Sequence, residues 1–188
     1  MNVRFDSRDL ALTAILSALY AVLVIVQGIS AAATIQLRIA DCLIPLAALL
    51  GWPAIIGMTL GAFVGNTYTS AALSNGVYDV AFGPMANLIA GLLIYMLRKR
   101  RFVGCMAGSV AIGVLVGSYV WMIFGGPSDI FSLKIPVSWP VWAASIVSIT
   151  ASSLIAIAGI GYLLLALLSR PKILEPLRSR GLKTAAEE

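Results

Sequence analysis

The chain alternates long stretches free of charge with short charged segments. Each charge-free stretch is long enough for a helix that crosses a bilayer, which needs about 20 mostly apolar residues. These stretches cover residues 10–37, 42–78, 80–97, 102–128 and 135–169. The second is too long for one span and contains Gly51-Trp52-Pro53, a typical helix break. The pattern predicts an all-α integral membrane protein, a six-helix bundle within residues 1–170, with helices at about 10–29, 40–50, 54–73, 79–97, 103–124 and 140–168.

The positive charges predict the orientation of these helices. With six helices, both termini fall on the same side of the membrane as the links near 51–53 and 98–103. Only Arg38 and Lys134 fall on the other side. Because Lys and Arg beside spans favour the cytoplasm, we expect cytoplasmic N- and C-termini, a cytoplasmic tail over 171–188 and a multi-pass protein of the cell membrane. The residues on the cytoplasmic side are Arg4, Arg8, Arg98, Lys99, Arg100, Arg101, Arg170, Lys172, Arg178, Arg180 and Lys183.

The N-terminal stretch has one alternative interpretation. Arg4 and Arg8, the apolar run and then Ala31-Ala32-Ala33 also follow the order of a secretory signal peptide with its cleavage site. The apolar run is longer than the roughly 7–15 residues of such a signal, so we expect it to remain as the first helix.

Composition excludes several classes of chemistry. The chain is 60% apolar and 11% charged, which favours lipid as its surroundings. It has no His, which excludes a Ser-His-Asp triad, a Cys-His pair and a His-ligated zinc site, and it has no phosphate-binding loop of the usual ATPase pattern. We therefore expect no enzyme, and no metal or cofactor in this chain. We expect no nucleic acid partner either, since the basic run 98–101 is explained by topology and by anionic lipid.

Small residues recur at every fourth position in three predicted helices. Such spacing keeps them on one helix face and lets another backbone approach closely. The stripe serves either packing inside the bundle or docking of a separate membrane protein. The first helix is the best candidate for docking, because its small face, Ala14 and Ala18, carries no polar group. The other stripes are Gly57, Gly61 and Gly65, and Ala144, Ser148, Ser152 and Ala156.

Polar residues inside the predicted helices gather toward the side opposite the termini. Ionisable groups at membrane depth are costly, which makes them candidates for function. Each also has a structural alternative: an Arg38–Asp41 ion pair that closes a loop, a helix N-cap at Asp79, and interhelical hydrogen bonds for Asn66 and Asn87. The nearby aromatic residues have the alternative of a membrane-interface belt. These aromatic residues are Tyr68, Tyr78, Tyr119, Trp121, Trp139 and Trp142.

Taken together, these groups favour a binding site for a flat, polar heterocycle. Aromatic rings stack on such a ligand, and carboxylates and amides bind its hydrogen-bonding edges. The candidate substrate-binding residues are Arg38, Asp41, Asn66, Asp79, Asn87, Tyr78, Trp139 and Trp142.

Three motifs in order carry a resemblance to a known family. They are QLRIAD at 36–41, GAFVGN at 61–66, and Asp79 followed by Gly83. With the Ala14–Ala18 pair, they resemble the substrate-binding S component of energy-coupling-factor (ECF) transporters, and more narrowly the queuosine-precursor transporter (QueT-like) family. The resemblance is clearest over residues 8–101.

The resemblance implies a division of labour between subunits. An S component captures its substrate at the extracytoplasmic face, and an ECF transmembrane coupling subunit with two ATPase subunits drives release inside. Ala14 and Ala18 match the motif that contacts the coupling subunit, and ATP would be used by the partner subunits alone. Arg38, Asp41, Asn66 and Asp79 match polar motif positions at the site. The implied substrate is a 7-deazaguanine such as 7-aminomethyl-7-deazaguanine.

One departure from the family pattern keeps alternatives open. The family carries a carboxylate in each of the last two helices, whereas the corresponding stretches here, 115–119 and 149–153, contain no acid. The alternatives are an ECF S component for another vitamin-like heterocycle and a non-transport scaffold protein of the cell envelope.

Overall fold

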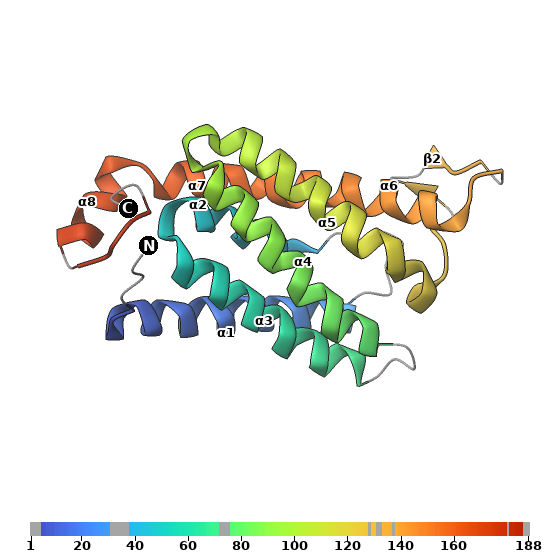
Figure 1. Cartoon of the computed structure of the whole chain (residues 1–188), viewed down its shortest axis with the longest axis horizontal. Helices are drawn as coiled ribbons and strands as arrows, with labels where there is room; N and C mark the ends of the chain where they lie inside the picture. The colour runs from blue at the N-terminus through green and yellow to red at the C-terminus, as the bar shows by residue number, and fades with distance from the viewer. Residues whose placement is uncertain are drawn as a thin grey trace.

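Long helices run side by side and form one bundle, with the start of α1 and the end of α7 at the same end (Figure 1). The computed structural model describes residues 5–30, 38–71, 76–127, 129–130, 133–136, 138–179 and 181–185. Its main helices are α1 (Ser7–Ser30), α3 (Trp52–Ser70), α4 (Val77–Met96), α5 (Arg101–Phe124), and a continuous rod of α6 (Val141–Ser153), the π-helical η3 (Leu154–Gly161) and α7 (Tyr162–Leu168). The short elements are the 3-10 helix η1 (Ile39–Leu46), α2 (Ala47–Leu50), the 3-10 turn η2 (Arg98–Arg100), the antiparallel strands β1 (Asp129–Ile130) and β2 (Leu133–Lys134), and α8 (Pro171–Ser179).

Four stretches of these helices are long and apolar enough to cross a membrane. They are Ser7–Gln27, Val77–Met96, Arg98–Ile123 and Val141–Leu168. Ile39–Leu50 is a shorter apolar helix, and α3 is not among the four. In the part that the structure describes, the chain is therefore an all-helical multi-pass membrane protein apart from one two-residue strand pair. The number of six spans and the cytoplasmic side of the termini stay predictions.

The break predicted at Gly51-Trp52-Pro53 is confirmed. Gly51 has a φ of 65°, a left-handed conformation that favours glycine. Its N–H donates to the carbonyl of Ala47, and its own carbonyl accepts from Ala54 and Ile55, so it ends α2 and begins α3. Since Pro53 fits the first turn of a helix, α3 begins at Trp52, two residues before the predicted start at 54.

The glycine stripe of α3 packs inside the bundle, against α1. A Cβ added at Gly61 would lie 2.6 Å from the Ser17 carbonyl oxygen and 2.8 Å from the Cβ of Tyr20. Gly57 and Gly65 are as close to other residues of α1. The packing interpretation of this stripe is therefore confirmed, since only glycine lets the two helices approach to this distance.

Two irregular helices pack against each other within the bundle. The described residues of η1 after Ile39 are all buried, and a Cβ added at Gly161 of η3 would lie 2.7 Å from the carbonyl oxygen of Cys42. The same Cβ would lie 2.8 Å from Pro45. Irregular backbone at membrane depth is tolerated where protein covers it, as it does here.

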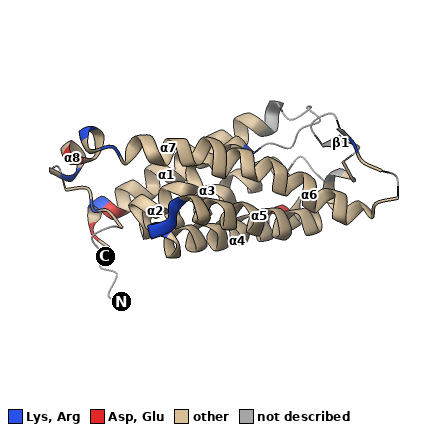
Figure 2. Cartoon of the chain, turned by 90° about the horizontal axis from the view of Figure 1, so that it is seen from above, with Lys and Arg blue, Asp and Glu red and all other residues tan. Residues whose placement is uncertain are grey.

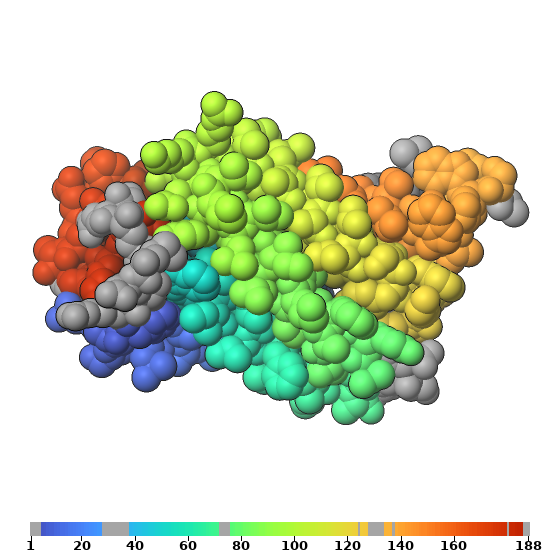
Figure 3. Space-filling view, viewed as in Figure 1, coloured from blue at the N-terminus to red at the C-terminus, as the bar shows by residue number. Residues whose placement is uncertain are grey.

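Basic residues gather at the end of the bundle that holds the start of α1 and the end of α7. Figure 2 shows Lys and Arg on α8, beside α2 and near the N-terminal end of the chain, and also beside β1 at the opposite end. In the space-filling view, α8 and the start of α1 share this end (Figure 3). The arrangement agrees with the predicted grouping of the positive charges on one side.

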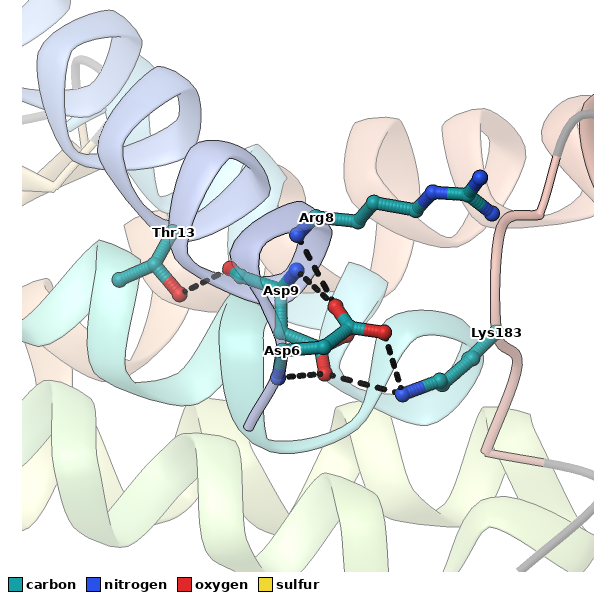
Figure 4. A network of polar contacts seen from close by, with 5 residues as sticks. All are labelled: Asp6, Arg8, Asp9, Thr13 and Lys183. Carbon is teal, nitrogen blue, oxygen red and sulfur yellow. Dashed lines mark hydrogen bonds and ion pairs between the residues drawn. The ribbon is translucent and has the colours of Figure 1, made fainter. Parts of the chain in front are cut away.

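The predicted tail does not simply extend away from this basic end, because residues 181–185 return to the bundle. Lys183 Nζ lies 2.8 Å from Asp6 Oδ2 and 3.3 Å from Asp9 Oδ2 (Figure 4). The N–H of Ala185 donates to the carbonyl of Leu49 at 2.8 Å, and Arg98 Nε donates to the carbonyl of Ala185. We call these contacts the terminal clamp. They join the C-terminal segment to the start of α1, the end of α2 and η2.

Candidate functional site

Four of the predicted site residues meet in one partly buried cluster. Arg38 precedes η1, Asp41 lies in the first turn of η1, Asn66 lies on α3, and Asp79 lies in the first turn of α4. Arg38 Nη2 donates to Asn66 Oδ1, and Arg38 Nε lies 3.9 Å from Asp41 Oδ1. Asn66 Nδ2 in turn donates to the carbonyl of Asp79 at 2.8 Å. We call these residues, with the two tyrosines described next, the polar cluster.

Two tyrosines complete the cluster by donating to its carboxylates. Tyr20 of α1 donates its hydroxyl to Asp41 Oδ1 at 2.5 Å, and Tyr119 of α5 donates to Asp79 Oδ1 at 2.8 Å. The belt interpretation of Tyr119 is therefore wrong, because its side chain is buried beside Phe82. The N-cap interpretation of Asp79 is also wrong, since Gly76 is the N-cap and Asp79 makes no capping bond.

Sequence reasoning missed Tyr20 altogether. It lies in an uninterrupted apolar helix, where a tyrosine does not disturb the hydrophobic pattern. The available signal was the hydroxyl itself, because a phenol buried in a membrane helix needs a partner. From the sequence we could therefore have predicted that Tyr20 needs a hydrogen-bond partner, but not that this partner is Asp41.

The centre of the cluster is buried, whereas Asp79 and the Arg38 side chain are partly exposed, and its carboxylates outnumber its cations. Asp41 is 3% exposed, and Asn66 and Tyr20 are also buried. With all groups ionised, one guanidinium faces two carboxylates, which leaves one uncompensated negative charge. Charge at membrane depth requires compensation, so the cluster favours a ligand that is cationic or rich in N–H donors.

Two buried donors at the cluster have no hydrogen-bond partner among the described residues. They are Arg38 Nε and Asn87 Nδ2. Asn87 is 5% exposed and lies on α4, about two helical turns after Asp79. A buried donor without a partner is costly, and a ligand with a carbonyl acceptor would satisfy it. Trp52 Nε1 also lacks such a partner, but Trp52 stacks near Tyr95 at the basic end and belongs to no part of the cluster.

Gly83 explains the spacing of the third motif. It follows Asp79 by one helical turn and faces the same neighbours. A Cβ added there would lie 2.3 Å from Asn66 Nδ2 and 3.2 Å from Asp79 Oδ1. The missing side chain therefore makes room for the Asn66 amide.

The structure does not join the three other predicted aromatic residues to the cluster. Tyr78, Trp139 and Trp142 are exposed, Trp142 to 54%, and among the described residues no hydrogen bond or ring contact links them to it. A substrate-binding role for these three, as for the members of the cluster, stays a prediction.

The small face of α1 is free of packing inside the bundle. Ala14 and Ala18 are exposed, whereas Thr13 and Tyr20 are buried on the side that faces α3 and η1. The predicted docking motif thus lies on a surface that a second membrane protein can reach.

No group of at least three Asp, Glu or Cys residues in the described part of the chain could bind a metal. Comparison with known proteins identifies a family. The family model described as QueT transporter matches residues 10–170. No curated protein and no solved structure matches the chain. Because the matched region covers most of the chain, including every residue of the polar cluster, the chain belongs to the QueT transporter family.

Proposed function

We propose that this chain is the substrate-binding S component of an ATP-driven ECF-type uptake transporter for a queuosine precursor, a 7-deazaguanine such as 7-aminomethyl-7-deazaguanine. The observation that carries the proposal is the partly buried polar cluster in a member of a transporter family. A membrane bundle without a ligand to recognise gains little from two carboxylates and an arginine held inside it.

The chemistry of the cluster matches the edges of this substrate. Asp41 and Asp79 accept hydrogen bonds from guanine-like N–H groups or from the cationic amine. Arg38 Nε and Asn87 Nδ2, which lack partners among the described residues, donate to the ring carbonyl. The site would thus offer acceptors to one edge of the ring and donors to the other. This arrangement selects a ring that carries both an amino and an oxo group, because a diamino ring has no carbonyl to pair with the buried donors.

Release inside is assigned to partner subunits. The ECF transmembrane coupling subunit docks on the face of α1 that carries Ala14 and Ala18, and two ATPase subunits use ATP. In this proposal the chain lies in the cell membrane with cytoplasmic termini, and it performs no covalent chemistry. Ala14→Trp and Ala18→Trp should abolish co-purification with the coupling subunit and leave substrate binding intact, and unchanged co-purification places the docking face elsewhere.

A second candidate is an ECF S component for another vitamin-like heterocycle. It is favoured by the absence of acidic residues in 115–119 and 149–153, where the family pattern carries a carboxylate. A less cationic ring would need fewer carboxylates.

Mass spectrometry of small molecules that co-purify with the detergent-solubilised protein tests both candidates. Calorimetric titration with 7-aminomethyl-7-deazaguanine should show binding to the wild type and a loss of about 10- to 100-fold in affinity for Asp41→Asn. Glu175→Gln, which removes an exposed carboxylate on α8, is the matched control and should bind as the wild type does. A different co-purifying heterocycle selects the second candidate. No bound heterocycle in any sample, with added 7-deazaguanines also failing to bind, overturns both and favours the scaffold.

A further inference from the structure

The two tyrosines of the polar cluster hold its carboxylates in the same way. Tyr20 reaches Asp41 from α1, and Tyr119 reaches Asp79 from α5. Each hydroxyl donates to the Oδ1 atom of a carboxylate in the first turn of another helix. Arg38 and Asn66 join the two pairs, so the cluster is a continuous chain of polar contacts with a phenol at either end.

We propose that Tyr20 and Tyr119 are internal surrogates for the substrate. In the free protein their hydroxyls donate hydrogen bonds to carboxylate oxygens, and N–H groups of the bound substrate displace them and donate to the same oxygens. This inference rests on the proposed function and adds a mechanism of exchange to it. The phenols keep Asp41 and Asp79 hydrogen-bonded within the protein, and the substrate enters by replacing them.

The energetics of the exchange follow from the burial of the carboxylates. A buried carboxylate without donors is strongly unfavourable, so the cluster must supply donors of its own. A phenol is a neutral donor, whereas an ammonium or a polarised ring N–H makes a stronger, charge-assisted bond. A substrate with such groups therefore competes successfully, while an apolar solute of the same size does not.

Binding must then be weaker than the substrate contacts alone would allow. In the free protein the phenols already donate hydrogen bonds to the carboxylates. Substrate binding must break these bonds, and their loss lowers the affinity for the substrate. Removing one hydroxyl removes its competition, so the variant should bind the substrate more tightly. A tyrosine that touched the substrate directly would give the opposite sign, and a merely structural tyrosine would leave affinity unchanged.

Tyr20→Phe and Tyr119→Phe test the inference, because each keeps the ring and removes only the hydroxyl. Calorimetric titration of the detergent-solubilised variants with 7-aminomethyl-7-deazaguanine should show affinity raised about 3- to 10-fold in each. Thermal unfolding without ligand should occur at lower temperature, and the shift that ligand produces should be larger than in the wild type. Tyr68→Phe, which removes an exposed hydroxyl from α3, is the matched control and should change neither readout.

The outcomes separate this inference from the function on which it rests. A wild type that binds no 7-deazaguanine overturns the proposed function and the surrogate role with it. A wild type that binds, with affinity lowered or unchanged in both phenylalanine variants, overturns the surrogate role alone.

Discussion

Asp41 and Asp6 each meet a cation, in opposite surroundings. Asp41 is buried, and its ion pair with Arg38 is long, with 3.9 Å between Oδ1 and Nε. Asp6 is in water at the basic end, and its contact with Lys183 Nζ is short at 2.8 Å, although the two side chains are 43% and 56% exposed. The closer contact is the weaker one, because solvent screens it and the longer contact is shielded.

The comparison shows that burial decides what each region can do. In the polar cluster every group depends on its neighbours, so the removal of one leaves others unsatisfied. In the terminal clamp the exposed side chains of Asp6 and Lys183 can return to water, whereas the Ala185 backbone is buried against α2. The cluster is therefore suited to recognise a ligand, and the clamp to hold a chain end in place with little effect on stability.

Arg38→Met should have the largest effect, because it leaves the buried Asp41 carboxylate without its cation and Asn66 Oδ1 without its donor. We expect the free energy of unfolding in mixed micelles to fall by about 3 kcal/mol. Binding of 7-aminomethyl-7-deazaguanine should be lost in calorimetry. Arg100→Met is the matched control, since Arg100 is exposed on η2, and it should unfold as the wild type does. If Arg38→Met and Arg100→Met had the same free energy of unfolding, the polar cluster would be no more sensitive to the loss of a cation than the exposed basic end.

Gly83→Ala should have an intermediate effect, because the added methyl group collides with the Asn66 amide. A cost of about 1–3 kcal/mol in the free energy of unfolding is expected, together with weaker substrate binding. Gly159→Ala is the matched control, since its Cβ would meet only the Leu154 carbonyl oxygen at 3.8 Å. If both variants behave alike in unfolding and binding, the cluster has more room than its packing indicates.

Lys183→Ala should have the smallest effect at neutral pH. The Lys183 ammonium, together with the backbone N–H groups of Asp9 and Arg8, lowers the pKa of Asp6 from its ordinary 3.8 to about 2. This contribution to stability is present in full above the ordinary pKa and is lost as the pH falls toward 2. The variant should raise the pKa of Asp6 toward 3.8, measured by NMR titration of the carboxyl, and should barely move the thermal midpoint at pH 7. Lys172→Ala, on α8, provides the control. A large loss of stability in Lys183→Ala alone would contradict the weak clamp.

Sequence reasoning succeeded where a residue interrupts an apolar background. The charged residues between stretches lie near several helix ends, and Gly51 marked the break. Asp41 and Asn66 were singled out because polar groups are rare in apolar helices, and the structure brings both into the polar cluster. It failed where a residue fits its background. Tyr20 does not disturb an apolar helix, although it completes the cluster.

Two other features could not be read from local pattern. The terminal clamp joins Asp6 to Lys183, and the local sequence around either residue does not predict that the two come into contact. The 3-10 and π character of η1 and η3 also leaves no trace in the spacing of apolar residues, because both segments are apolar throughout most of their length. In both cases tertiary contacts decide the outcome.

The pairing of η1 with η3 has a consequence for biogenesis. Ile39–Leu50 is too short to enter a bilayer as an independent span, and its burial depends on a segment synthesised more than a hundred residues later. The ribosome must therefore deliver α3, α4 and α5 before this segment can reach its final depth. Because Asp41 lies in η1 and Tyr119 lies on α5, the polar cluster cannot be complete before α5 has been synthesised.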